Sequence, residues 1–299
     1  MNQEYQKYLS PSVVKKIDNL YLRAKLVVEG FIIGLHKSPY HGFSVEFSEH
    51  RPYGFGDEIR HIDWKLLAKT DKLFIKQFEE ETNLKTYIIL DKSSSMSYGS
   101  NNNMIKFDYA KTLSASLAYL MIKQQDAVGL ATFDKEIIDY IPPKSKAGHL
   151  NYLLNVLHSS KVKGDTKISP ILHSLAESIK KRGLIILISD LLDNPNEIIN
   201  GLRHFRHKGH EVIIFHILDD NEINFNFTGV TNFIDSEDGS NIKTDPRQIK
   251  KEYMKAVSEF CGIYKKECSQ NNIDYLKVNT SETLEKSLID YLIKRSKLS

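Results

Sequence analysis

The sequence predicts an α/β fold in which a doubly wound, mostly parallel sheet follows a small N-terminal helix-plus-strand module. Short, almost continuous apolar runs recur after residue 84, and such runs are typical of strands buried on both faces of a parallel sheet. Segments with helical periodicity lie between the runs. This alternation predicts helices on both faces of the sheet.

The expected elements follow from these two patterns. Strand cores are predicted at residues 87–90, 127–133, 184–188, 212–217 and 273–278. Helices are predicted at residues 104–123, 147–158, 169–181, 195–207, 246–270 and 281–296. Residues 137–141 are expected to add an antiparallel edge strand after the second run.

Residues 1–83 form the predicted N-terminal part, and residues 84–299 the main domain. Ser10 and Pro11 favour a helix start, and apolar residues at three- and four-residue spacing extend that helix to Gly30. Alternation at residues 43–47 indicates a half-buried strand. A short helix over residues 63–69 and a strand over residues 73–78 are expected to complete the module.

Composition narrows the class of protein. The chain has 299 residues, of which 41% are hydrophobic and 26% charged, with a formal net charge of +3. This near balance gives no strong attraction to nucleic acid or to anionic membranes. Residues 1–10 are polar, and no apolar run approaches the length of a membrane-spanning helix. The two cysteines are expected to be thiols in a reducing compartment. We therefore expect a cytoplasmic protein.

Oxygen-bearing side chains follow the predicted strands at the places where a parallel sheet binds ligands. Asp91, Ser93 and Ser95 come directly after the first run, Asp190 follows the third, and Thr166 lies in a loop between them. Ligands of open parallel sheets bind outside the carboxyl ends of the strands, and carboxylates and hydroxyls are hard ligands suited to Mg²⁺, Mn²⁺ or Ca²⁺. The sequence thus predicts a metal site that keeps one position open for a partner's carboxylate.

This arrangement resembles the von Willebrand factor A fold, a Rossmann-type domain with a metal-ion-dependent adhesion site (MIDAS). The resemblance covers roughly residues 84–299. It implies that Asp91, Ser93, Ser95 and Thr166 contact the metal and that Asp190 acts through water. One departure is Asp165, which stands where the family more often has a small residue.

The upstream block from His50 to Trp64, followed by Lys76-Gln77-Phe78-Glu79, resembles the signature of domain-of-unknown-function family fifty-eight. Members of that family are similar to partners of MoxR-type AAA+ ATPases, which implies an adaptor or chaperone role. Trp64 is expected to anchor a core. Four charged residues are candidates either for a structural charge network or for a partner-facing surface: Arg51, Asp57, Arg60 and Asp63.

Several interpretations stay open. The serines and aspartates are also common helix caps. A phosphohydrolase using Asp91 as nucleophile is a second function, although Ser93 stands where an acid–base carboxylate is normally needed. A metal-independent scaffold acting through residues 38–83 is a third. Nucleotide-binding and hydrolase motifs are absent, so we expect no enzyme, no catalytic residues and no cofactor other than the metal.

Overall fold

The computed structural model describes residues 10–36, 50–52, 54, 64–70, 72–76, 85–100, 104–164, 167–235 and 239–295. The chain divides into two compact units. One contains Met1–Gly34 and Leu84–Ser299, and the other contains Leu35–Asn83. The N-terminal helical residues thus fall in the unit that resumes at residue 84, and not with the module of residues 35–83.

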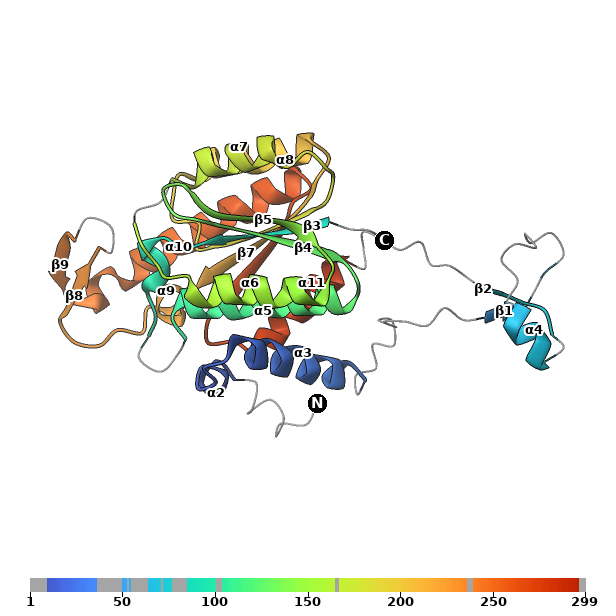
Figure 1. Ribbon diagram of the computed structural model, residues 1–299. Helices are drawn as coiled ribbons and strands as arrows, with labels where there is room; N and C mark the ends of the chain where they lie inside the picture. Colours follow the sequence, from blue (N-terminus) through green and yellow to red (C-terminus); the bar gives the residue numbers. More distant parts are fainter. Residues whose placement is uncertain are drawn as a thin grey trace. The chain divides into compact units, whose positions relative to one another are not determined.

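A six-stranded sheet forms the centre of the main domain (Figure 1). Its strands are β3 (Lys85–Asp91), β4 (Ala127–Phe133), β5 (Ile137–Lys144), β6 (Leu184–Ser189), β7 (Glu211–Leu218) and β10 (Asp274–Asn279). Their order is β10-β7-β6-β3-β4-β5. All neighbours are parallel except β4 and β5, which pair antiparallel. The parallel sheet and its antiparallel edge are therefore confirmed.

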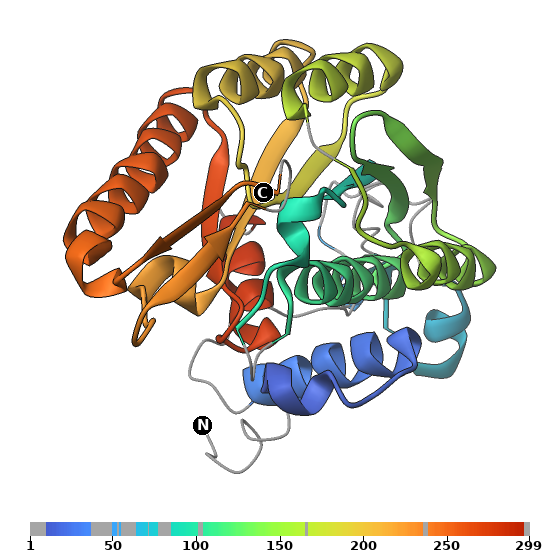
Figure 2. The same cartoon turned by 90° about the vertical axis from the view of Figure 1, so that its left-hand side faces the viewer.

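Helices cover both faces of this sheet. They are α5 (Lys106–Lys123), α6 (Ala147–Ser159), α7 (Ile168–Ser178), α8 (Pro195–His207), α10 (Pro246–Gln270) and α11 (Leu284–Arg295). Figures 1 and 2 show α7, α8 and α10 on one face and α5, α6 and α11 on the other. Apolar side chains of β3, β4, β6 and β7 pack against α7, α8 and α10 in one buried cluster that includes Ile89, Leu187 and Phe205.

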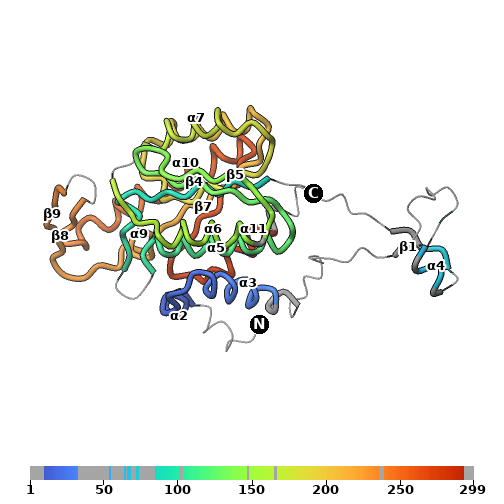
Figure 3. Tube along the Cα trace, in the orientation of Figure 1, coloured from blue at the N-terminus to red at the C-terminus, as the bar shows by residue number. Residues whose placement is uncertain are grey.

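The N-terminal helix differs from the prediction. It is interrupted, with α2 at Pro11–Val14 and α3 at Leu20–His36. The Asn19 side chain accepts a hydrogen bond from the Leu22 backbone N–H at 3.1 Å, which satisfies an amide that a helix start leaves free. Helix α3 lies alongside α5 (Figure 3) and buries Val27 and Phe31.

A hairpin that the sequence analysis missed follows β7. The short helix α9 (Asp220–Asn224) leads into the antiparallel strands β8 (Thr231–Ile234) and β9 (Asn241–Thr244). Phe225, Phe227 and Phe233 form an aromatic cluster with Tyr253 of α10. Four-residue strands with an aromatic cluster at their base carry too little periodicity to be recognised in sequence.

The unit of residues 35–83 contains β1 (His50–Pro52), α4 (Trp64–Thr70) and β2 (Phe74–Lys76), with β1 and β2 antiparallel. Helix α4 and strand β2 confirm two expected elements, whereas the strand expected at residues 43–47 lies outside the described residues. The expectation for Trp64 was wrong, because its side chain is 59% exposed. Within the described residues, no helix combines the length and apolarity that crossing a membrane requires.

Gly129 in β4 permits close packing of the edge strand. A Cβ at this position would lie 2.6 Å from the Ile141 carbonyl oxygen of β5. We therefore expect Gly129→Ala to lower the free energy of unfolding by about 1–3 kcal/mol. Gly262 of α10 is the control, because a Cβ there meets nothing within 4 Å, and Gly262→Ala should stabilise the helix by up to about 1 kcal/mol. Urea unfolding measures both, and equal effects would contradict this description of the edge.

Candidate functional site

The candidate site lies at the carboxyl ends of β3 and β6. The chain runs from β3 to β4 and β5 on one side and then crosses to β6, β7 and β10 on the other. Strand order thus reverses beside β3, and such switch points are where open α/β sheets bind ligands. Asp91 ends β3, and Asp190 directly follows β6.

Asp91 is fully buried and held by two donors. Its Oδ1 accepts a hydrogen bond from the Ser93 backbone N–H at 2.9 Å, and its Oδ2 accepts one from the Ser189 hydroxyl at 2.6 Å. Ser189 ends the neighbouring strand β6, so the strand pairing itself brings this hydroxyl to the carboxylate. Ser189 is a site residue whose role was not assigned from sequence.

The two predicted serine ligands lie next to each other. The hydroxyl oxygens of Ser93 and Ser95 are 3.0 Å apart, and both side chains are buried. The short 3₁₀ helix η2 (Ser94–Ser97) supplies the tight turn that brings alternate residues to one side. Three of the predicted donors, Asp91, Ser93 and Ser95, therefore converge at the end of β3.

Thr166, like Asp165, lies outside the described residues, but both sides of its loop are attached to the site. The Ser94 backbone N–H and hydroxyl both donate to the Gly164 carbonyl, each at 2.9 Å. On the other side, the Ile168 backbone N–H donates to the Asp193 side chain at 3.0 Å. Gly164 is thus tied to the Asp91 loop, and Ile168 to the loop that follows Asp190.

Asp190 has a partner that the sequence analysis missed. The Lys106 ammonium lies 2.7 Å from Asp190 Oδ2 and 2.7 Å from Glu222 Oε1. Lys106 has no exposed surface, and Asp190 is 1% exposed. Burial acts to lower the pKa of Lys106, but the two carboxylates prevail and raise it, so the lysine stays charged.

A signal for Lys106 exists in the sequence. It lies four residues before Ala110 and seven before Leu113, so it shares the apolar stripe that α5 turns to the sheet. A lysine on such a stripe needs an acidic partner, because an unpaired buried charge is very costly. Glu222 carried no comparable signal, since α9 was not predicted.

The backbone turns sharply after Asp190. Leu191 is buried and adopts a left-handed conformation with φ of 55°, which costs roughly 1–3 kcal/mol for a non-glycine residue. Three hydrogen bonds hold it there. Its N–H donates to the Ser189 hydroxyl at 2.9 Å, and its carbonyl accepts from the Tyr264 hydroxyl at 3.1 Å and from the Asp193 N–H at 2.8 Å. The turn leaves Leu192 47% exposed beside the site.

The charges of the site are not balanced. Asp91, Asp190 and Glu222 bring three carboxylates and Lys106 one ammonium, so the four groups carry two excess negative charges once Asp91 has lost its proton and all of them are ionised. Burial, together with repulsion from Asp190, raises the pKa of Asp91 to about 7. Two buried carboxylates this close are a place where an added cation is electrostatically favoured.

The donor set fits a small hard cation. One carboxylate and two hydroxyls at the end of β3, with Asp190 opposite, supply the oxygen ligands that Mg²⁺ and Mn²⁺ prefer. In the described part of the chain, no three His, Cys, Asp or Glu side chains are placed together to hold an ion. Any such ion would depend on hydroxyl and water oxygens in addition to Asp91.

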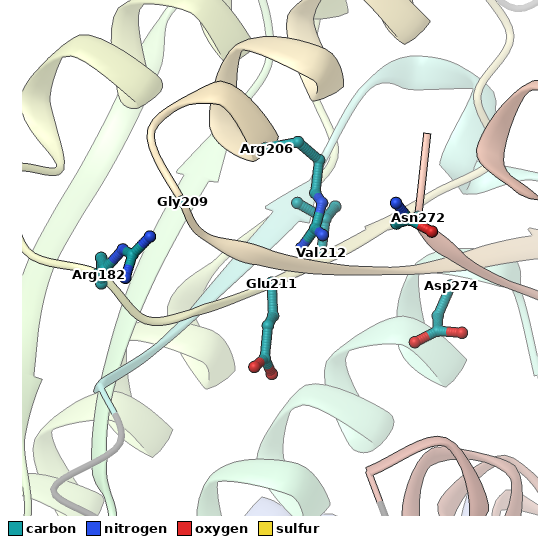
Figure 4. Close-up of a pocket in the computed structure, with 7 residues that line it drawn as sticks. All are labelled: Arg182, Arg206, Gly209, Glu211, Val212, Asn272 and Asp274. Carbon is teal, nitrogen blue, oxygen red and sulfur yellow. The ribbon is translucent and has the colours of Figure 1, made fainter. Parts of the chain in front are cut away.

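A cavity of about 540 Å³ lies elsewhere, at the amino ends of β6, β7 and β10 (Figure 4). Arg182, Arg206, Glu211 and Asp274 line it. The strands are parallel, so this cavity lies at their amino ends, whereas Asp91 and Asp190 lie at the opposite, carboxyl ends. The cavity is therefore separate from the candidate metal site.

The four candidate partner-facing residues are placed only in part. Arg51 belongs to strand β1, where it pairs with Ile75 of β2. Asp57, Arg60 and Asp63 lie outside the described residues. Their role in a charge network or a partner surface stays a prediction.

Comparison with known proteins finds one family model and several related proteins. The family model described as "Protein of unknown function DUF58" matches residues 49–260. The uncharacterized protein Rv1480 of Mycobacterium tuberculosis is 24% identical over 234 residues, which are 77% of this chain and 72% of that protein. Uncharacterized protein YeaD of Bacillus subtilis is 26% identical over 107 residues, covering 36% of this chain and 24% of YeaD.

Among solved structures, BatB from Bacteroides thetaiotaomicron, a conserved hypothetical protein, superposes with a TM-score of 0.50 and 18% identity, covering 72% of this chain and all of that one. The SpRpn10 VWA domain matches more distantly, with a TM-score of 0.39 and 15% identity over 69% of this chain and 93% of that one. The expected α/β fold with a mostly parallel central sheet is confirmed.

Replacing Lys106 should reveal its buried ion pairs. Lys106→Met leaves Asp190 and Glu222 without their cation, so we expect the free energy of unfolding to fall by about 3–5 kcal/mol. Lys111→Met on the same helix is the control, because Lys111 and Asp108 form a partly exposed pair worth less than about 1 kcal/mol. Chemical denaturation of both variants would refute the assignment if the two losses were equal.

The raised pKa of Asp91 predicts a pH dependence of stability in chelator-treated protein. The unfolded chain releases this proton near the ordinary value of 3.8, whereas the folded chain keeps it until about pH 7. Between these values the folded state binds more protons, so stability should fall as pH rises. Urea unfolding from pH 4.5 to 8 should show this component in the wild type and not in Asp91→Asn. Parallel pH curves for the two proteins would contradict it.

Proposed function

The chain belongs to the family of unknown function DUF58 and has an α/β fold with a mostly parallel central sheet, and we propose that it is a divalent-cation-dependent protein-binding module. The observation that carries the proposal is the buried pair Asp91 and Asp190, with an excess of negative charge at the switch point of the sheet. Asp91, Ser93 and Ser95 would hold the ion, with Thr166 from the neighbouring loop, and Asp190 would act through water.

The residues of the chain have separate tasks in this proposal. Ser189 and the Ser93 backbone N–H orient the Asp91 carboxylate. Lys106 binds the Asp190 oxygen that would otherwise add another negative charge to the site. Bound Mg²⁺ or Mn²⁺ would supply an electrophilic position that a carboxylate of a partner protein can occupy.

Apolar side chains near the site support a protein as the partner. Leu192 follows Asp190 by two residues and is exposed. Figures 1 and 2 show the β8–β9 hairpin at the same end of the domain as η2. Val230, Ile234 and Ile242 of this hairpin region are each 67–69% exposed. Exposed apolar groups beside a charged centre are typical of protein-binding surfaces.

We name a MoxR-type AAA+ ATPase as the partner, on the strength of the family resemblance, with this chain acting as an adaptor or chaperone in the cytoplasm. The free thiols of Cys261 and Cys268 support a reducing compartment. Capture of the purified ATPase should require Mg²⁺ or Mn²⁺ and be lost with chelator. Capture that resists chelator and Asp91→Ala but fails in Arg60→Glu would instead favour a scaffold acting through residues 38–83.

The proposal assigns no enzymatic turnover. Both Asp91 oxygens accept hydrogen bonds from the protein, and Ser93, which follows by two residues, is a poor proton shuttle at neutral pH. A turnover assay with generic phosphoesters and Mg²⁺ separates the alternatives. Activity present in the wild type and lost in Asp91→Asn would favour a phosphohydrolase over a binding module.

Metal binding itself is the primary prediction. Titration calorimetry with Mn²⁺ or Mg²⁺ should show binding to the wild type and at least a tenfold weaker affinity in Asp91→Ala, because the directly bound carboxylate is missing. Asp274→Ala is the matched control, since Asp274 begins β10 at the opposite edge of the sheet, and it should bind like the wild type. Equal binding by wild type and Asp91→Ala would remove the proposal.

A further inference from the structure

Helices α7 and α8 approach each other unusually closely. A Cβ built on Gly201 of α8 would lie 2.8 Å from the Leu172 Cβ of α7, nearer than side chains normally pack. The absence of a side chain at Gly201 therefore sets the separation of the two helices. His173 follows Leu172, and His204 lies about one turn after Gly201, so both imidazoles are carried by this tightly packed pair.

The two imidazoles face each other across the helix pair. Their Nδ1 atoms are 3.1 Å apart, and the ring centroids are 5.3 Å apart. Two nitrogens that share one tetrahedral zinc ion at about 2.0–2.1 Å lie about 3.3–3.4 Å apart. The two Nδ1 atoms now share a hydrogen bond, so an ion would take the place of the proton between them and widen their separation only slightly. Both rings sit on helices rather than on a loop.

The second nitrogen of His204 is also committed. Its Nε2 lies 2.9 Å from Glu177 Oε1, and Glu177 Oε2 lies 2.7 Å from the Lys208 ammonium. The hydrogen bond from Lys208 contributes most to lowering the pKa of Glu177, so this carboxylate is ionised and accepts the Nε2 proton. His204 Nδ1 then keeps its lone pair toward His173. Metal-binding histidines are typically oriented by a carboxylate in this way.

We propose that His173 and His204 form a binding site for a divalent transition-metal ion, with Zn²⁺ or Cu²⁺ as its chemical class. Imidazole nitrogen suits these ions, whereas the oxygen donors around Asp91 suit Mg²⁺ and Mn²⁺. The histidines supply two ligands, and water takes the remaining positions on the exposed side of His173. Glu177 is a positioning residue that fixes the His204 ring. This site is independent of the function proposed for the Asp91 site.

Zinc titration of the full chain, free of any polyhistidine tag and saturated with Mg²⁺, tests the site. Calorimetry should show a Zn²⁺ binding event that weakens at least tenfold in His173→Ala and in His204→Ala. His207→Ala is the matched control, because His207 is an exposed histidine one turn along α8, and it should keep wild-type affinity. Asp91→Ala should also keep it, which separates this result from any failure of the oxygen site.

Two further measurements exclude a trivial loss of structure. Glu177→Gln should weaken Zn²⁺ binding about tenfold or more while leaving the circular dichroism spectrum unchanged. Cu²⁺ bound to the wild type should show hyperfine coupling to imidazole nitrogen in its electron paramagnetic resonance spectrum, and this signal should be lost in His173→Ala. Wild-type Zn²⁺ affinity in both His173→Ala and His204→Ala, or an equal loss in His207→Ala, would overturn the proposal.

Discussion

Two carboxylates, Asp91 and Asp190, are buried side by side at the carboxyl edge of the sheet, and the rest of the site is arranged around their repulsion. Asp91 is more costly to ionise than a surface carboxylate, because it is buried and faces the charge of Asp190. Two sets of contacts stabilise the pair. A hydroxyl and an amide donate hydrogen bonds to Asp91, and the Lys106 ammonium pairs with Asp190. Lys106 also pairs with Glu222, so the net charge of the site stays negative.

The fold explains why these groups meet. Strands β3 and β6 are neighbours although about a hundred residues separate them, and their parallel pairing brings Asp91, Ser189 and Asp190 to one edge. Helix α5 starts at the same edge and points Lys106 inward, while α9 brings Glu222 from beyond β7. The strand topology brings these carboxylates together, and their repulsion is unfavourable. A bound divalent cation would offset their negative charge.

Much of this arrangement could be predicted from sequence, for a physical reason. Strands buried on both faces need continuous apolar runs, which fixed the main strands and helices, and the residues after each run gave Asp91, Ser93, Ser95 and Asp190. Contacts that depend on unpredicted elements were missed. Glu222 lies on the short α9, and His173 meets His204 only because Gly201 lets two helices approach. Trp64 was wrongly assigned to a core. It belongs to a module whose sequence has little periodicity, and burial cannot be predicted without such a pattern.

A crystal structure of the protein grown with Mn²⁺, with anomalous differences recorded at the manganese edge, tests the central claim most directly. The excess negative charge at the end of β3 should draw an ion to bonding distance of Asp91, Ser93 and Ser95, with the Lys106 and Asp190 pair intact. A map without an anomalous peak at these oxygens, at manganese concentrations that saturate ordinary protein sites, would contradict the claim that the buried carboxylates exist to hold a cation.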